Sequence, residues 1–182
     1  RDLAKQIAEI AALPIQQEKA ELWRRLNRLE PVRPMVMLQM LEDSAWPDTG
    51  INDTLQCTDP FLRRQALVLR RLLYQWEHQA GDMVIDNVVS VPWVVNDTGI
   101  GLEVSAERPE HWFGAARFVA VIAEEGDAGK IRLPQVTVDR EETERRYQQH
   151  CDVCGDLLEV HKTSPSNMWF DPFDEFIQYR GV

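Results

Sequence analysis

Short apolar runs of strand length alternate along this chain with longer segments of helical periodicity. The apolar runs lie at four places in the sequence, at residues 35–38, 83–95, 118–123 and 157–161. Alternation of this kind is typical of α/β proteins, in which parallel strands are connected through helices and the sheet is buried on both faces. The sequence therefore predicts an α/β fold with parallel βα units.

Two of the predicted helices carry clear start signals. Asp59, followed by a proline, is placed to cap a helix over residues 61–79, because a carboxylate at the N-cap accepts a backbone N–H and proline suits the first helical position. Asp139 is placed to cap a helix over residues 140–154, and Glu142 completes a capping-box pattern. Two further amphipathic helices are predicted ahead of the first apolar run.

Composition narrows the class of protein. The chain has 182 residues, 44% of them hydrophobic, and a formal net charge of −10. The acidic excess argues against binding to nucleic acid or anionic membranes, because phosphate contacts need clustered Lys and Arg. No apolar run approaches the roughly 20 residues of a transmembrane helix, and three cysteines without framework spacing fit a reducing compartment. We expect one cytoplasmic domain over residues 1–182 that acts on a small molecule.

The predicted series of helices and strands ends without an element that would complete the fold. After the run at 157–161, Asp171 and a proline open a last helix, and the sequence ends soon afterwards. A complete (β/α)8 barrel takes about 250 residues, so the chain has room for roughly three of its strands. We expect the front part of a larger α/β protein, completed by a C-terminal part or by a homo-oligomer. An open three-layer α/β domain is the alternative architecture.

A group of thiols and imidazoles raises the possibility of a metal site. His150, Cys151, Cys154 and His161 combine the soft ligands that a tetrahedral zinc site uses. However, the two cysteines are three residues apart near the end of a predicted helix, and the sequence has no second Cys-x-x-Cys pair. We therefore interpret the cysteines as packing residues and predict no metal site from this group.

Asp86 is a carboxylate inside an otherwise apolar run. A buried carboxylate is costly unless it is paired or faces a cavity, so Asp86 is a candidate acid, base or substrate anchor. The alternative is that Asp82 and Asp86 bracket the entrance of the strand and face solvent. The residues alone leave both interpretations open.

Three further side chains are candidates for substrate binding. Gln39 follows the first predicted strand and His161 ends the last one, and the carboxyl ends of barrel strands carry the chemistry of such enzymes. Trp93 belongs to a set of aromatic residues in loop-like segments, together with Trp46, Trp112, Phe113, Trp169 and Phe170. Such aromatics can wall a pocket for a flat ligand, or they can anchor loops.

Several segments, taken in order, resemble the uroporphyrinogen decarboxylase-like superfamily. They are LWRRLN at 22–27, PVRPMV at 31–36, DMVIDNVVSVP at 82–92, LPQVTVD at 133–139, GDLLEV at 155–160 and WFDPFD at 169–174. The resemblance covers almost the whole chain. It implies the N-terminal portion of a TIM (β/α)8 barrel with extra N-terminal helices.

The resemblance also implies activities. The family includes porphyrinogen decarboxylases, in which a strand-two aspartate contacts the pyrrole nitrogens, and Asp86 matches that position to within one residue. It also includes zinc-dependent methyltransferases that act with corrinoid proteins and take their zinc ligands from later in the barrel.

The chain departs from the decarboxylases after the first predicted strand. Residues 38–43 read LQMLED in place of an arginine-rich stretch, and carboxylated porphyrinogens need cationic clamps. We therefore expect methyl transfer, with zinc and a corrinoid as cofactors and a corrinoid protein as partner. Decarboxylation and a non-catalytic binding module are the alternatives.

Overall fold

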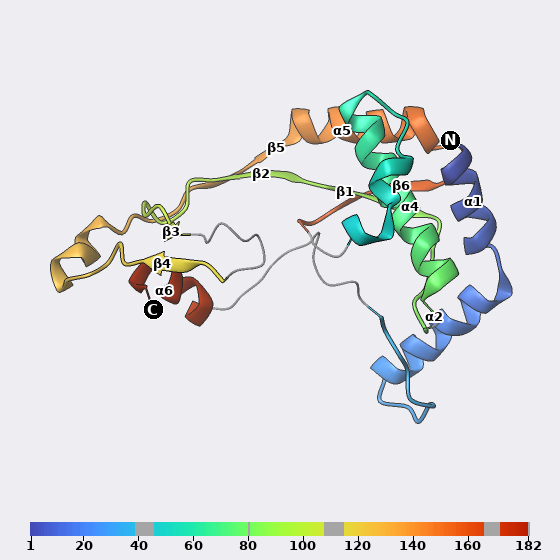
Figure 1. The fold of residues 1–182 in the computed structure, drawn as a ribbon, viewed down its shortest axis with the longest axis horizontal. Helices are drawn as coiled ribbons and strands as arrows, with labels where there is room; N and C mark the ends of the chain where they lie inside the picture. Colours follow the sequence, from blue (N-terminus) through green and yellow to red (C-terminus); the bar gives the residue numbers. More distant parts are fainter. Residues whose placement is uncertain (39–45, 80, 108–114, 166–171, 182) are drawn as a thin grey trace. The chain divides into compact units, whose positions relative to one another are not determined.

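The computed structural model of the chain describes residues 1–38, 46–79, 81–107, 115–165 and 172–181. The fold is mixed α/β, and within these ranges the strands form two-stranded sheets and no closed barrel (Figure 1). The chain divides into two compact units, Arg1–Ser90 with Tyr147–His161 and Val91–Arg146 with Lys162–Val182. None of the helices described is both long and apolar enough to cross a lipid bilayer.

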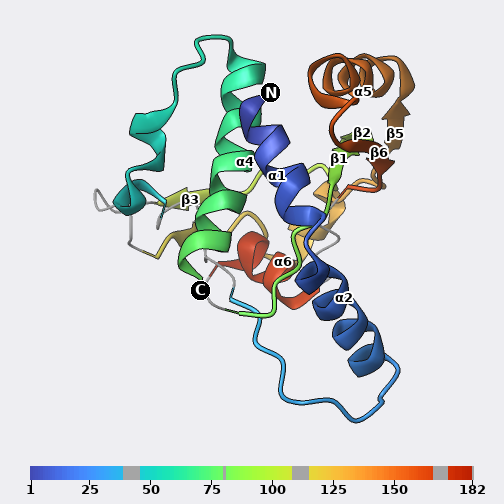
Figure 2. The same ribbon diagram turned by 90° about the vertical axis from the view of Figure 1, so that its right-hand side faces the viewer.

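The first unit is mainly helical. Its helices are α1 (Asp2–Ala11), α2 (Pro14–Asn27), α4 (Pro60–His78) and the second half of α5 (Arg140–Cys154), with 3-10 turns η1 (Pro47–Thr49) and η2 (Ile51–Thr54). Helix α1 packs along α4, as Figure 2 shows. The expected N-terminal helices are therefore present, and α1 belongs to the same packed unit as α4.

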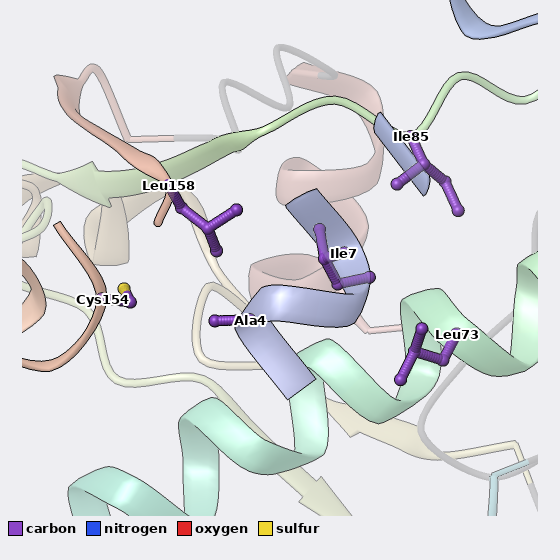
Figure 3. Close-up of a cluster of buried hydrophobic side chains, with 6 residues drawn as sticks. All are labelled: Ala4, Ile7, Leu73, Ile85, Cys154 and Leu158. Carbon is purple, nitrogen blue, oxygen red and sulfur yellow. The ribbon is translucent and has the colours of Figure 1, made fainter. Parts of the chain in front are cut away.

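A small apolar core holds the first unit together. Ala4 and Ile7 lie on one face of α1, because residues three apart on a helix project to the same side. They pack with Leu73 of α4 and Cys154 of α5, and with Ile85 and Leu158, which precede strands (Figure 3). All six side chains are at most 9% exposed. The core therefore joins the N-terminal helix to the helices and strand entrances that follow.

The predicted helix starts are confirmed. Asp59 Oδ1 accepts the Leu62 N–H at 2.9 Å at the start of α4, and Asp139 Oδ1 accepts the Glu142 N–H at 2.8 Å at the start of α5. At the start of α5, the prediction that Glu142 completes a capping box is wrong. Its carboxylate binds Arg145 and Arg146, which follow it at helical spacing.

Helix α2 ends in a Schellman motif rather than at a proline. The Glu30 N–H donates to the Arg25 carbonyl at 3.0 Å and the Leu29 N–H to the Leu26 carbonyl at 2.9 Å. Leu29 occupies the left-handed position, with φ 61°, where glycine is usual. Its side chain is 93% exposed, so nothing packs to compensate for the strained backbone.

Strands β1 (Val88–Pro92) and β6 (Glu159–Thr163) pair with each other. The Glu159 N–H donates to the Asn87 carbonyl at 2.8 Å, and the Trp93 N–H donates to the Thr163 carbonyl at 2.9 Å. Since the starts of the two strands are adjacent and so are their ends, the strands run parallel. This pair agrees with the expectation of parallel βα units.

The second unit is built from antiparallel ribbons. The expectation of parallel βα units is therefore wrong for the strands other than β1 and β6. Strand β2 (Val94–Asp97) pairs with β5 (Val136–Asp139), and β3 (Ser105–Glu107) pairs with β4 (Arg117–Val119). Antiparallel pairs need no crossover helix, and the described residues between β2 and β5 form only short elements, including η3 (Glu125–Lys130). Helix α6 (Pro172–Arg180) packs on β4 (Figure 1).

Two of the predicted strands differ from the structure. Residues 35–38 form no strand, because Val36 makes single hydrogen bonds to Asp82 instead of a ladder. The long run at 83–95 is not one strand either: β1 starts only at Val88, and β2 begins after a break at Trp93 with a different partner. Three of the four hydrophobic runs therefore overlap strands, whereas β3 and β5 lie outside all of the runs.

Candidate functional site

The ends of the parallel strands β1 and β6 meet at Trp93. This residue directly follows β1, and its N–H donates to the carbonyl of Thr163, the last residue of β6. The Trp93 ring is half-buried. Trp93 was expected to be a substrate-binding residue, and its placement at the carboxyl ends of two parallel strands is the position at which α/β enzymes bind ligands.

Arg140 lies over the Trp93 ring. Its guanidinium carbon is 5.8 Å from the ring centroid, within the range of a cation–π interaction. Arg140 is the first residue of α5, so the positive end of the helix dipole adds to its charge. Planar aromatic and cationic groups side by side suit a flat ligand that carries a carboxylate.

Buried hydrogen bonds hold this pair in place. The Val94 N–H, next to Trp93, donates to Thr143 Oγ1 at 3.0 Å, and Thr143 is fully buried. On β6, the Lys162 ammonium forms an ion pair with Glu144 of α5. The helix that carries Arg140 is therefore tied to the start of β2, next to Trp93, and to β6, which ends beside Trp93.

Asp86 lies outside this group. It precedes β1 rather than lying within it, its side chain is exposed, and its Oδ1 accepts the Val88 N–H at 3.2 Å. The carboxylate thus closes a short turn ahead of the strand. Asp82, however, is 6% exposed, so the interpretation that both aspartates face solvent is wrong for Asp82.

His161 is part of a polar chain that joins the two parallel strands. Its Nε2 lies 3.1 Å from Glu159 Oε2, and Glu159 Oε1 accepts from Asn87 Nδ2 at 3.2 Å. His161 itself is exposed. Because Asn87 neighbours Asp86 in sequence, the structure brings the Asp86 turn and the Glu159–His161 pair to the same strands, in the first unit.

Cys154 of α5 borders an apolar cavity of about 400 Å³ in the first unit. Its walls include Leu62, Ala66 and Leu69 of α4, Val89 of β1, and His150 and Cys154 of α5. The His150 ring stands edge-on to Phe61, with centroids 4.9 Å apart. Burial, and then the nearby Cys151, raise the pKa of the Cys154 thiol. Both features agree with the interpretation of these side chains as packing residues.

Among the residues that the structure describes, no group of three or more His, Cys, Asp or Glu side chains is placed to hold a metal ion. His150, Cys151, Cys154 and His161 do not converge on one point there.

Some predicted positions lie outside the described residues. Gln39 is one of them, and so are Trp112, Phe113, Trp169 and Phe170. Trp46 is described: it is buried, edge-on to Tyr74 at 6.0 Å and 4.8 Å below the Arg71 guanidinium. Trp46 therefore anchors its loop on α4, which agrees with the alternative interpretation that the aromatic residues anchor loops.

Sequence reasoning missed Arg140, and it missed the burial of Asp82 and its pairing with Arg33. Arg140 follows the N-cap Asp139, and its position at the first turn of a helix after a strand was a usable signal. For Asp82 no local signal exists, since its partner Arg33 lies 49 residues earlier in the chain.

Comparison of the chain with protein-family models, with curated proteins and with solved structures finds no match.

Proposed function

We propose that this chain is the N-terminal portion of a TIM-barrel enzyme similar to the uroporphyrinogen decarboxylases and corrinoid methyltransferases, and that the protein containing it transfers methyl groups. The ordered resemblance of six segments supports the family. The absence of an arginine-rich stretch at 38–43 favours methyl transfer over decarboxylation of a porphyrinogen.

The placement of successive strand-length segments carries the proposal. The Asp82 N–H donates to the Val36 carbonyl at 2.7 Å, so the first apolar segment lies beside the second. Strand β1 then lies beside β6, in parallel. Helices α4 and α5 separate these three segments along the sequence. A (β/α)8 barrel requires this order, because its consecutive strands are parallel neighbours separated by helices.

The proposal locates the site at the carboxyl ends of β1 and β6. Trp93 follows β1, and Thr163 ends β6. Trp93 and Arg140 would form one wall of the site, with Arg140 binding an anionic group of the substrate. The antiparallel ribbon of β2 and β5 starts at Val94, next to Trp93, and would flank the opening.

The cofactors of the proposed reaction are zinc and a corrinoid. The described residues provide no set of zinc ligands, so the metal would be bound by residues elsewhere in the protein. A corrinoid protein would be the methyl-exchange partner. The residues of this chain would bind and orient the substrate beside Trp93.

Methyl transfer is tested with the protein that contains this chain. Metal analysis should find about one zinc per active site. With methylcob(III)alamin as donor and a thiol as acceptor, the loss of the cobalt–carbon absorption should be protein-dependent. Trp93→Ala should slow it about tenfold or more, whereas Leu133→Ala, at a side chain 91% exposed, is the matched control. A zinc-free protein without this activity would refute the proposal.

Decarboxylation is the second candidate, and the Arg140–Trp93 pair favours it, because a cation above an aromatic ring suits a carboxylated aromatic substrate. It predicts carbon dioxide release from a carboxylated porphyrinogen without metal, and loss of that activity in Asp86→Asn. If neither activity is found, the remaining candidate is a binding module.

A further inference from the structure

The apolar cavity of the first unit shares no residue with the Trp93–Arg140 pair. It measures about 400 Å³, and every residue that lines it belongs to the first unit. Ala4 and Cys154, two side chains of the core in Figure 3, form part of its wall. A cavity of about 150 Å³ holds one benzene ring, so this one has room for a larger molecule.

The wall of the cavity offers apolar contacts and few partners for water. Leu62 and Leu69 of α4 and Val89 of β1 contribute aliphatic side chains to it. Burial raises the pKa of the Cys154 thiol, as expected for a group that faces little water. Since a water molecule held in a cavity needs roughly two to four polar partners, an apolar occupant suits this space better than water does.

The charged side chains of the wall are bound to other protein groups. Arg1 Nη1 donates to Asp156 Oδ1 at 2.9 Å, and Asp152 Oδ1 accepts from Gln148 Nε2 at 2.7 Å. A charged ligand would lose its hydration in this apolar space and would find the opposite charges already bound, which is unfavourable. These contacts therefore favour an uncharged occupant.

Two further features of the wall favour an aromatic ligand with one polar group. The rings of Phe61 and His150 stand edge-on to each other in the wall, with centroids 4.9 Å apart. Another aromatic ring can add to such a pair in an edge-on or offset contact. Gln65, half-buried in the wall, carries an amide that can both donate and accept a hydrogen bond.

We propose that this cavity binds an uncharged aromatic molecule of about two fused rings, whose polar group is hydrogen-bonded to the Gln65 amide. The rings of the ligand contact Phe61, Leu69 and Val89. Neither Trp93 nor Arg140 lines the cavity, so this second site does not depend on the proposed methyl transfer.

Methyl NMR of the chain titrated with 2-naphthol tests the proposal, because this measurement reports contact residue by residue. The methyl resonances of Leu62, Leu69 and Val89 should shift together and reach saturation. Val119 and Val138 of the second unit are the controls, since they are 41% and 47% exposed and would report non-specific contact with apolar surface. Their resonances should not shift.

Ala66→Trp tests the location of the ligand. Ala66 lines the cavity on α4, so an indole there should occupy part of the space and weaken 2-naphthol binding about tenfold or more. Val68→Trp is the matched control, because it adds the same side chain to the same helix at a position that is 47% exposed and outside the wall. Val68→Trp should bind 2-naphthol as the wild type does.

Gln65→Leu tests the hydrogen bond to the ligand. Leucine keeps most of the volume of the side chain but lacks the amide, so 2-naphthol should bind about fivefold more weakly. Naphthalene, which lacks the hydroxyl group, should bind Gln65→Leu and the wild type equally. This variant also keeps the proposal testable if Ala66→Trp does not fold.

Several results would overturn the proposal. One is a set of cavity methyl resonances that do not shift, or that shift only in step with those of Val119 and Val138. Another is a folded Ala66→Trp that binds 2-naphthol as the wild type does. Cavity methyl shifts that depend on protein concentration before ligand is added would mean that a second copy of the chain covers the cavity. Unchanged 2-naphthol affinity in Gln65→Leu would remove the role of the amide.

Discussion

The backbone N–H of Val94 donates to Thr143 Oγ1 at 3.0 Å, and the same hydroxyl donates to the Asp139 carbonyl at 2.5 Å. Thr143 has no exposed surface. One buried hydroxyl thus joins the start of β2, next to Trp93, to the first turn of α5, which begins at Arg140.

Replacing this hydroxyl tests its contribution. Thr143→Val keeps the shape but leaves the Val94 N–H without its acceptor, so we expect the free energy of unfolding to fall by about 1–3 kcal/mol. Urea denaturation measures the change. Thr143→Ser keeps the hydroxyl and should lose less than Thr143→Val. Equal stability of wild type and Thr143→Val would contradict the role of the hydrogen bond.

Leu29→Gly should stabilise the protein. An L-residue in the left-handed region costs about 1–2 kcal/mol, and glycine avoids this at an entropic cost of about 0.5–1 kcal/mol. The side chain is 93% exposed, so its removal loses little packing. We expect a gain of up to about 1 kcal/mol in urea denaturation. Leu29→Ala retains the Cβ and should show no such gain; a gain of equal size there would contradict the explanation.

Glu142 makes the stability of α5 depend on pH. Hydrogen bonds from Arg145, and then from Arg146, lower the pKa of Glu142 from about 4.5 to about 2. A carboxyl whose pKa is lower in the folded state stabilises above its unfolded pKa, and this contribution disappears as the pH falls through the folded value. The stabilisation should therefore be complete above about pH 4.5 and be lost by about pH 2.

Thermal melts of the wild type and Glu142→Gln check this dependence. The difference between their melting temperatures should shrink as the pH falls from 4.5 to 2. A carbon-13 titration of the Glu142 carboxyl gives its pKa directly. An ordinary value there would refute the ion pairs.

The cysteines of α5 should differ in reactivity. Cys154 is buried and its thiol pKa is raised, whereas Cys151 is half-buried. Because the thiolate is the nucleophile, iodoacetamide at mild alkaline pH should alkylate Cys151 about tenfold faster than Cys154. Mass spectrometry of timed digests measures both rates. The two rates should become equal in denaturant, and equal rates in the folded protein would contradict the burial of Cys154.

The helices were predictable because their signals are local. Asp59 and Asp139 cap the helices they were expected to cap, since an N-cap needs only a side chain and a backbone three residues away. Strand ends were less predictable. The apolar run at 83–95 gives no sign of the point at which β1, paired with β6, ends and β2, paired with β5, begins. That break between the two strands puts Trp93 at the candidate site.

The candidate site was predictable in part. Trp93 was expected, while Arg140 above its ring was not, because 47 residues separate Trp93 from Arg140 and no local pattern joins them. Asp86 was selected for its apolar neighbours, yet the buried and paired carboxylate is Asp82. The difference between the two aspartates depends on Arg33. Arg33 lies too far from Asp82 along the chain to be recognised as its partner from neighbouring residues.

The sequence by itself determined the helices, their caps and the alternation of apolar runs, because these follow from hydrogen bonds and periodicities within a few residues. Only the tertiary structure decided which segments lie side by side, which carboxylate is buried and which cation covers Trp93. Those outcomes depend on contacts between residues far apart in the chain, whose free energy is gained only when the segments are packed together.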